Sequence, residues 1–244
     1  MRLDRQSDPI ANGAEARYGA GMTPATAPVE RPLLVPIAPA ADGALARVGP
    51  DPAVLDAFGD VSVPLVAWQR PVDARASAAL AAVARALPPV DETVPRLEAG
   101  AALLPAALRG LPGWDWLAAD IDALVARFAD ATAATRLRFA FGAVLDDKCK
   151  RFHVDFVRAR MVVTYTGPGT QWLDGPDAAR FGPRGTQAGS CGHGVPPAAI
   201  RSATAGDVVW MRGVHGGGAA AVHRSPPLGE SGVPRVVFTL STAD

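Results

Sequence analysis

Hydrophobic residues in the first part of the chain recur at helical spacing. One stripe spans residues 73–87 and consists of Ala76, Leu80, Val83 and Leu87. Asp73 precedes it as a candidate N-cap, and Pro88 stops it. A second stripe spans residues 114–131 and consists of Trp114, Leu117, Ile121, Leu124, Val125 and Phe128. These patterns predict two helices, with a shorter one around residues 103–108, packed on the outside of a sheet.

After Thr135 the hydrophobic period changes to two, as in strands. Further extended segments are predicted at residues 61–68, 157–165, 170–173, 199–202, 207–211 and 235–241. Pro64 makes the first of these an edge or bulged strand. Many short strands without intervening helices favour an antiparallel sandwich or barrel. We therefore predict an α+β fold, with an antiparallel sandwich or barrel in the C-terminal half and the N-terminal helices on its outside.

The distribution of Pro, Ala and Gly divides the chain. Residues 1–50 are dense in these residues and have no helical or strand period, which predicts a disordered tail. Residues 51–244 are expected to form a single domain. Within it, residues 51–135 are expected to give mainly helical support, and residues 136–244 to form the barrel.

Charge and cysteine content narrow the function classes. The 24 basic and 24 acidic residues cancel, so no net field attracts nucleic acid or an anionic membrane. Cys149 and Cys191, the two cysteines, are too few for a disulfide framework. The N-terminus has no apolar segment that secretion would require, and no apolar run is long enough to cross a bilayer. We predict a cytoplasmic protein.

Two separated histidines and an aspartate form a candidate metal site. His153 and Asp155 stand two residues apart in an extended segment, so we expect them on one side, together with the apolar residues of the strand that follows. The segment 206–210 is expected to return the chain to this place, and His223 follows it. Two imidazoles and one carboxylate, with open coordination positions, suit non-haem Fe(II) and oxygen chemistry.

A plainer interpretation stays open for these three residues. His153 and His223 could be hydrogen-bonded core histidines, and Asp155 could cap a turn. His215 is a rival second imidazole, but the glycines at 216–218 indicate a mobile loop.

Zinc is an alternative metal. Cys149 and His153, with Cys191 and His193, could form a zinc site, although the spacing of the last two is unlike that of the usual zinc fingers. His193 is otherwise expected to be an exposed loop residue.

The order of these residues is similar to that of double-stranded β-helix dioxygenases that use Fe(II) and 2-oxoglutarate. The resemblance implies that the C-terminal half is a double-stranded β-helix (jelly-roll or cupin-like) barrel. In those enzymes an Arg about ten residues after the distal His grips the cosubstrate carboxylate. The resemblance implies this role for Arg235, or else for Arg224. The interval from His223 to Arg235 is slightly longer here, and Val237 stands where many such enzymes carry a hydroxyl.

The same resemblance implies a pocket for a small-molecule substrate. Tyr165 or Arg160 would line it. Arg158 and Arg160 beside a metal would suit an anionic substrate. The sequence indicates no oligomeric state.

Four segments resemble a bacterial family known only as domain of unknown function 1826. They are residues 68–71, 149–155, 164–172 and 223–227, and they include Phe-His-Val-Asp and Thr-Tyr-Thr-Gly-Pro-Gly-Thr. The resemblance covers roughly residues 60 to 242. It implies no established reaction, although a link to zinc homeostasis is implied by the neighbouring genes of members.

Three hypotheses follow. The protein is an Fe(II)- and 2-oxoglutarate-dependent oxygenase, a non-enzymatic zinc- or metal-binding barrel linked to metal homeostasis, or a barrel that has lost its chemistry and acts as a binding module.

Overall fold

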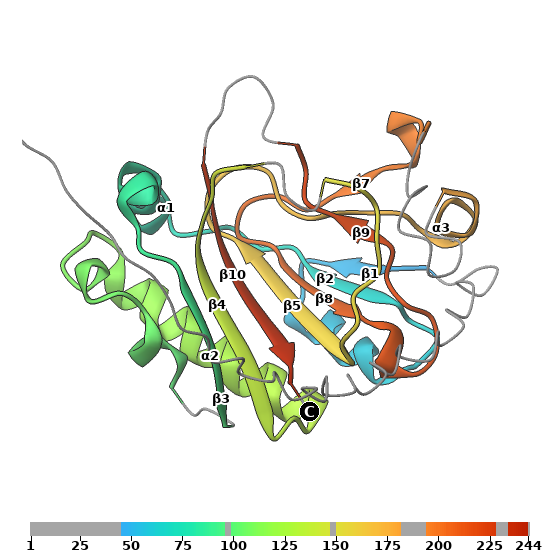
Figure 1. Ribbon diagram of the computed structural model, residues 1–244, viewed down its shortest axis with the longest axis horizontal. Coiled ribbons are helices and arrows are strands. Elements are labelled where there is room, and N and C mark those ends of the chain that lie inside the picture. Colours follow the sequence, from blue (N-terminus) through green and yellow to red (C-terminus); the bar gives the residue numbers. More distant parts are fainter. Residues whose placement is uncertain (1–44, 96–98, 147–149, 182–193, 228–233, 244) are drawn as a thin grey trace, which may run out of the picture. The chain divides into compact units, whose positions relative to one another are not determined.

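The computed structural model describes most of the chain beyond residue 44 (Figure 1). The described residues are 45–95, 99–146, 150–181, 194–227 and 234–243. They belong to one compact unit, Val35–Asp244. The tail predicted for residues 1–50 therefore lies largely outside the described residues. Its last part does not fit that prediction, because Arg47–Gly49 forms strand β1.

A seven-stranded sheet runs through the unit in the order β1-β2-β8-β5-β10-β4-β3. Its strands are β1 (Arg47–Gly49), β2 (Leu65–Trp68), β3 (Val90–Pro95), β4 (Arg136–Val144), β5 (Ala159–Thr164), β8 (Val208–Arg212) and β10 (Arg235–Thr242). All neighbours are antiparallel except β1 and β2. The alternation predicted from Thr135 onward is confirmed, since Leu137, Phe139 and Phe141 of β4 are buried.

Helices cover one face of this sheet (Figure 1). Helix α1 (Ala74–Val83) begins at Asp73, whose side chain accepts hydrogen bonds from the backbone N–H groups of Arg75 and Ala76. Helix α2 (Trp114–Thr132) buries its predicted stripe against the sheet. The remaining helical turns are η1 (Pro52–Gly59), η2 (Ala84–Ala86), η3 (Gly100–Leu103), η4 (Ala106–Leu108), α3 (Gly175–Phe181), η5 (Pro197–Ala199) and η6 (Val214–Gly216). Residues 103–108 thus form 3₁₀ turns instead of a helix.

A three-stranded sheet covers the opposite face. It consists of β7 (Arg201–Ser202), β6 (Gln171–Trp172) and β9 (His223–Arg224), in that order. Trp172 and Ala221 pack there against Leu65 and Met211 of the large sheet. The α+β class and the large antiparallel sheet are as predicted. A closed barrel is not seen among the described residues, because these strands are two residues long and leave the sheets separate.

Two strands depart from the sequence prediction. Pro64 precedes β2, and β2 pairs on both sides, with β1 and β8, so it is not an edge strand. Strand β3 was not predicted, because its middle residues Asp91, Glu92 and Thr93 are polar and exposed. It forms the sheet edge beside β4. Residues 51–135 therefore supply strands as well as helices.

Among the described helices, none combines the length and the apolar composition that a bilayer span requires.

Candidate metal centre

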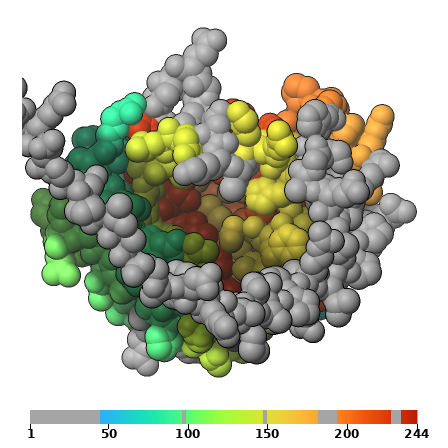
Figure 2. Space-filling view, in the orientation of Figure 1, coloured from blue at the N-terminus to red at the C-terminus, as the bar shows by residue number. Residues whose placement is uncertain are grey.

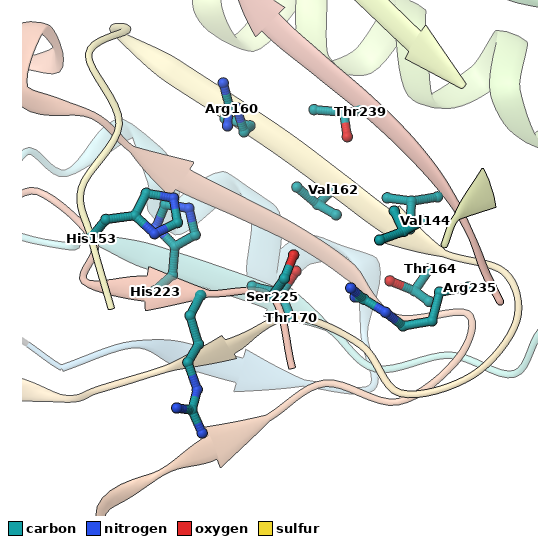
Figure 3. A pocket seen from close by; sticks show the side chains of 12 residues that line it. Val144, His153, Arg160, Val162, Thr164, Thr170, His223, Ser225, Arg235 and Thr239 are labelled. Carbon is teal, nitrogen blue, oxygen red and sulfur yellow. The ribbon is translucent and has the colours of Figure 1, made fainter. Parts of the chain in front are cut away.

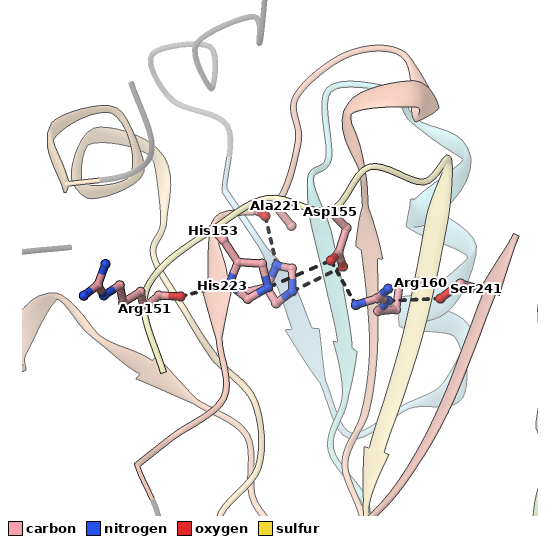
Figure 4. Close-up of polar contacts among 7 residues, drawn as sticks. All are labelled: Arg151, His153, Asp155, Arg160, Ala221, His223 and Ser241. Carbon is pink, nitrogen blue, oxygen red and sulfur yellow. Dashed lines mark hydrogen bonds and ion pairs between the residues drawn. The ribbon is translucent and has the colours of Figure 1, made fainter. Parts of the chain in front are cut away.

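His153, Asp155 and His223 meet at one place between the two sheets. One potential ligand atom from each lies within 4.8 Å of the others. Nε2 of His223 lies 3.3 Å from Oδ2 of Asp155, and Nε2 of His153 lies 3.9 Å from Oδ1 (Figure 4). The structure thus brings together the three residues predicted from the sequence, although Asp155 and His223 stand 68 positions apart in the chain.

Backbone pairing holds the two histidines side by side. His153 and His223 form an isolated antiparallel bridge, with both N–H···O distances at 2.9 Å. The backbone carbonyl of Asp155 accepts a hydrogen bond from the N–H of Val214, also at 2.9 Å. These backbone bonds hold the residues that carry the three side chains at one place.

The prediction that His153 and Asp155 share a side with the apolar residues of the following strand is wrong. His153 and Asp155 precede β5, and bends at residues 156–158 interrupt the alternation. Ala159 and Met161 of β5 are buried beneath the helices. The opposite face of β5, which carries Arg160 and Val162, is the one beside the histidines.

The hydrogen bonds of both imidazole rings define their tautomer. Nδ1 of His153 lies 2.9 Å from the carbonyl oxygen of Arg151, and Nδ1 of His223 lies 3.1 Å from that of Ala221. A carbonyl oxygen only accepts, so each Nδ1 carries the proton. Each Nε2 of a neutral ring then presents a lone pair to the site. Metal-binding histidines are oriented in this way.

Asp155 is buried and its two oxygens have different surroundings. Oδ1 accepts a hydrogen bond from Nη1 of Arg160 at 2.9 Å. Oδ2 has no hydrogen-bond partner among the described residues and faces Nε2 of His223. No described backbone N–H donates to this carboxylate, so Asp155 is not a turn cap. Burial alone would raise the pKa of the Asp155 carboxyl, but His223 and Arg160 outweigh it and lower that pKa to about 2.

The electrostatics of the rings favour a metal over two protons. Their centroids are 4.5 Å apart. Burial first, and then the charge of His223, lower the pKa of His153 below its usual value. A single cation would satisfy both Nε2 atoms and the buried Oδ2, whereas two adjacent imidazolium rings would repel each other. The donor set therefore fits a divalent metal ion.

A cavity of about 160 Å³ opens beside the three ligands (Figures 2 and 3). It is lined by Val144, His153, Arg160, Val162, Thr164, Thr170, His223, Arg224, Ser225, Arg235, Val237 and Thr239. Figure 2 shows a hollow on this face with the red of the C-terminal strand at its floor. Three arginines lie in this lining, so the cavity is suited to anions.

The two arginines expected to hold a cosubstrate both line the cavity. Arg235 begins β10 and is 2% exposed. Arg224 has two described neighbours. Its Nε donates to Oε1 of Gln171 at 2.8 Å, and its guanidinium lies 4.5 Å from the centroid of the Phe152 ring. Thr239 follows Arg235 at an interval of four, and shared strand parity is the sequence signal for its place in the lining.

Tyr165 does not line the cavity, contrary to the prediction. It is fully buried on the helix side of the sheet, where its hydroxyl donates to Oδ2 of Asp120 of α2 at 2.8 Å. Burial raises the pKa of Tyr165 well above its ordinary value. Arg160, the other residue named for this pocket, does line it.

Of the rival ligands, His215 does not join the cluster. His215 lies in η6, is exposed, and has its ring 6.3 Å from that of Phe156. Cys149, Cys191 and His193 lie outside the described residues. A zinc site built on them stays a prediction.

A family model described as "Protein of unknown function (DUF1826)" matches residues 49–241. The chain belongs to this family. The family resemblance of the four sequence segments is thereby confirmed. The match includes the three candidate ligands and Arg235, so the site lies within the DUF1826 domain.

No curated protein matches the chain. Similar solved structures include a Pseudomonas putida prolyl-4-hydroxylase, 14% identical over 78% of this chain and 96% of that one, with a TM-score of 0.41. Iron-bound HygX from Streptomyces hygroscopicus is 13% identical over 79% and 87%, with a TM-score of 0.43. A rice dioxygenase for auxin oxidation is 14% identical over 81% and 82%, with a TM-score of 0.41.

Proposed function

We propose that this protein is a non-haem Fe(II)- and 2-oxoglutarate-dependent oxygenase that acts on a small molecule. One observation carries the proposal. Two imidazole Nε2 atoms and a buried carboxylate oxygen converge beside a cavity that contains arginines. Two histidines and one carboxylate leave coordination positions open, which is the ligand set of non-haem iron oxygenases.

The ligands and the cavity wall have separate roles in this proposal. His153, Asp155 and His223 would hold iron, and bound iron would supply the activation of oxygen. Arg235 would grip the distal carboxylate of 2-oxoglutarate, because a guanidinium fork matches a carboxylate in charge and shape. Val237 offers no hydroxyl, but Thr239 of the same strand lines the cavity and does.

Other side chains support a small anionic substrate. Arg224 and Arg160 are the remaining cations of the lining. Arg224 is the second choice for the cosubstrate, because it directly follows the ligand His223, whereas the similar dioxygenases carry this Arg about ten residues further along the chain. Tyr165 has no place in this proposal because it faces the helices.

The same three ligand atoms support a second candidate, a zinc-binding protein without oxygenase activity. Zinc also accepts two imidazoles and a carboxylate, with a further open position. The identity of the metal, and the response to 2-oxoglutarate, separate the two candidates.

The test is to purify the protein without oxygen, measure its bound metal, and then supply 2-oxoglutarate and oxygen. We expect iron and a slow, oxygen-dependent conversion of 2-oxoglutarate to succinate even without the substrate. Both should be lost in His153→Ala and His223→Ala and retained in the control His215→Ala, which removes an exposed histidine outside the cluster. Bound zinc with no turnover would favour the second candidate. Metal retained in both histidine variants would exclude the site.

A further inference from the structure

Arg160 connects the carboxylate ligand to the neighbouring strand. Its Nη1 donates to Oδ1 of Asp155 at 2.9 Å, and its Nε donates to Oγ of Ser241 at 3.0 Å (Figure 4). Ser241 lies directly opposite Arg160 in the pairing of β10 with β5, and it is 2% exposed. Strand β10 therefore holds the guanidinium through its Nε, and Nη1 points toward Asp155.

This contact makes the two oxygens of Asp155 unequal. Oδ1 receives a charge-assisted hydrogen bond from Arg160, the stronger kind of hydrogen bond. Oδ2 is left facing Nε2 of His223 at 3.3 Å, with no described hydrogen-bond donor. Oδ2 is thus the oxygen of Asp155 on which no described hydrogen bond competes with a cation held by the two imidazoles.

We propose that Arg160 is a positioning residue that keeps Asp155 a one-oxygen ligand and so keeps a coordination position of the metal open. The inference rests on the metal site of the proposed function. A free carboxylate can bind a metal through one oxygen or two, and the second oxygen would occupy a position that a cosubstrate or oxygen needs. Arg160 disfavours this second bond, because its hydrogen bond engages a lone pair of Oδ1 and fixes the orientation of the carboxylate.

A purely structural ion pair would behave differently. The ion pair is partly buried, since the side chains of Arg160 and Asp155 are 27% and 9% exposed, and its loss would lower stability whatever its role. Such a pair would leave the coordination number of a bound metal unchanged. The absorption of bound Co(II) depends on coordination number and geometry, so Co(II) reports on the inferred role without any turnover.

The experiment titrates the full chain with Co(II) alone, without oxygen, and records binding and absorption. The variants are Arg160→Met, Arg160→Lys and Ser241→Ala. The matched control is Arg138→Met, which removes an exposed arginine that pairs with Asp91 on the β3–β4 edge. Circular dichroism checks that each variant is folded, and Arg160→Lys and Ser241→Ala test the inference if Arg160→Met does not fold.

We expect Arg160→Met to bind one Co(II) per chain about 10- to 100-fold more weakly, with an altered spectrum that 2-oxoglutarate changes less. Arg160→Lys should restore part of the spectrum, since an ammonium can donate to Oδ1, and Ser241→Ala should show a smaller change in the same direction. Arg138→Met should match the unchanged protein.

Two failures are distinguishable. If Arg160→Met keeps the affinity and spectrum of the unchanged protein while His153→Ala and His223→Ala lose Co(II), the role of Arg160 is wrong and the metal site stands. If the histidine variants keep their Co(II), the metal site itself is wrong.

Discussion

Replacing Asp120 by Ala should destabilise the protein strongly. Asp120 of α2 forms an ion pair through both of its oxygens with Arg70, in the loop after β2, and also accepts a hydrogen bond from the hydroxyl of Tyr165. The exposed fractions of the Arg70 and Asp120 side chains are 12% and 7%. Arg70 also lies over the Trp68 ring, 4.8 Å from its centroid. Asp120→Ala would leave a buried guanidinium and a buried hydroxyl without this partner.

The magnitude follows from burial. Removing one member of a buried ion pair costs about 3–5 kcal/mol. Alanine adds no helix penalty, because it has the highest helix propensity. For a chain of this size each kcal/mol lowers the melting temperature by about 2–4 °C, so we expect a decrease of about 6–20 °C.

The matched control is Asp91→Ala. It removes the same charge and breaks an ion pair with Arg138, but those side chains are 50% and 56% exposed. Exposed pairs contribute about 0–1 kcal/mol, so a decrease of at most about 4 °C is expected. Thermal unfolding followed by circular dichroism measures both variants. Equal decreases in melting temperature in the two variants would refute the argument that the ion pair of Asp120 with Arg70 stabilises the fold more because it is buried.

Three further predictions concern the site. Gly167→Ala should weaken 2-oxoglutarate binding about 10-fold and leave Co(II) binding intact, because Gly167 has a φ of +78° and a Cβ there would lie 2.9 Å from Cγ of Arg235. Gly59→Ala is its control, since a Cβ at Gly59 meets nothing within 4 Å, and equal affinities in a titration would contradict the assignment of Arg235. Removing bound metal with a chelator should lower the melting temperature. Adding Co(II) at 100 times its Kd should raise the free energy of unfolding by about 2.7 kcal/mol. The Co(II)-dependent rise should be absent in His223→Ala, and a rise of the same size there would place the metal elsewhere. Arg235→Met should abolish the effect of 2-oxoglutarate on the Co(II) spectrum while metal affinity stays within a few-fold, and an unchanged response would transfer the cosubstrate role to another residue such as Arg224.

The helices could be predicted because they depend on the local spacing of residues. The ligand set could be predicted from its residue types. The stripe of α2 and the N-cap at Asp73 are properties of spacing and of one side chain. His153, Asp155 and His223 were selected because two imidazoles and a carboxylate suit a metal ion, and the structure brings the three together. The prediction that His153 and Asp155 share the apolar face of β5 was wrong, because hydrophobic alternation does not reveal the bends at residues 156–158.

The remaining misses depend on tertiary context. Tyr165 was placed in the cavity, but its hydroxyl finds a buried acceptor in Asp120 on a helix 45 residues away. Strand β3 is polar because it is a sheet edge, so its sequence carries no hydrophobic period. The smaller sheet does not close a barrel with the large sheet, because each of its strands is two residues long. The length of these strands depends on their pairing partners, so hydrophobic alternation alone does not predict it.

The most direct test of the metal centre is to grow crystals without oxygen in the presence of Fe(II) and to measure anomalous scattering at the iron absorption edge. We predict one peak within coordination distance of Nε2 of His153, Nε2 of His223 and Oδ2 of Asp155. The other oxygen of Asp155 should remain on Arg160. A peak that lies away from these three atoms, or no peak in crystals that contain iron, would contradict it.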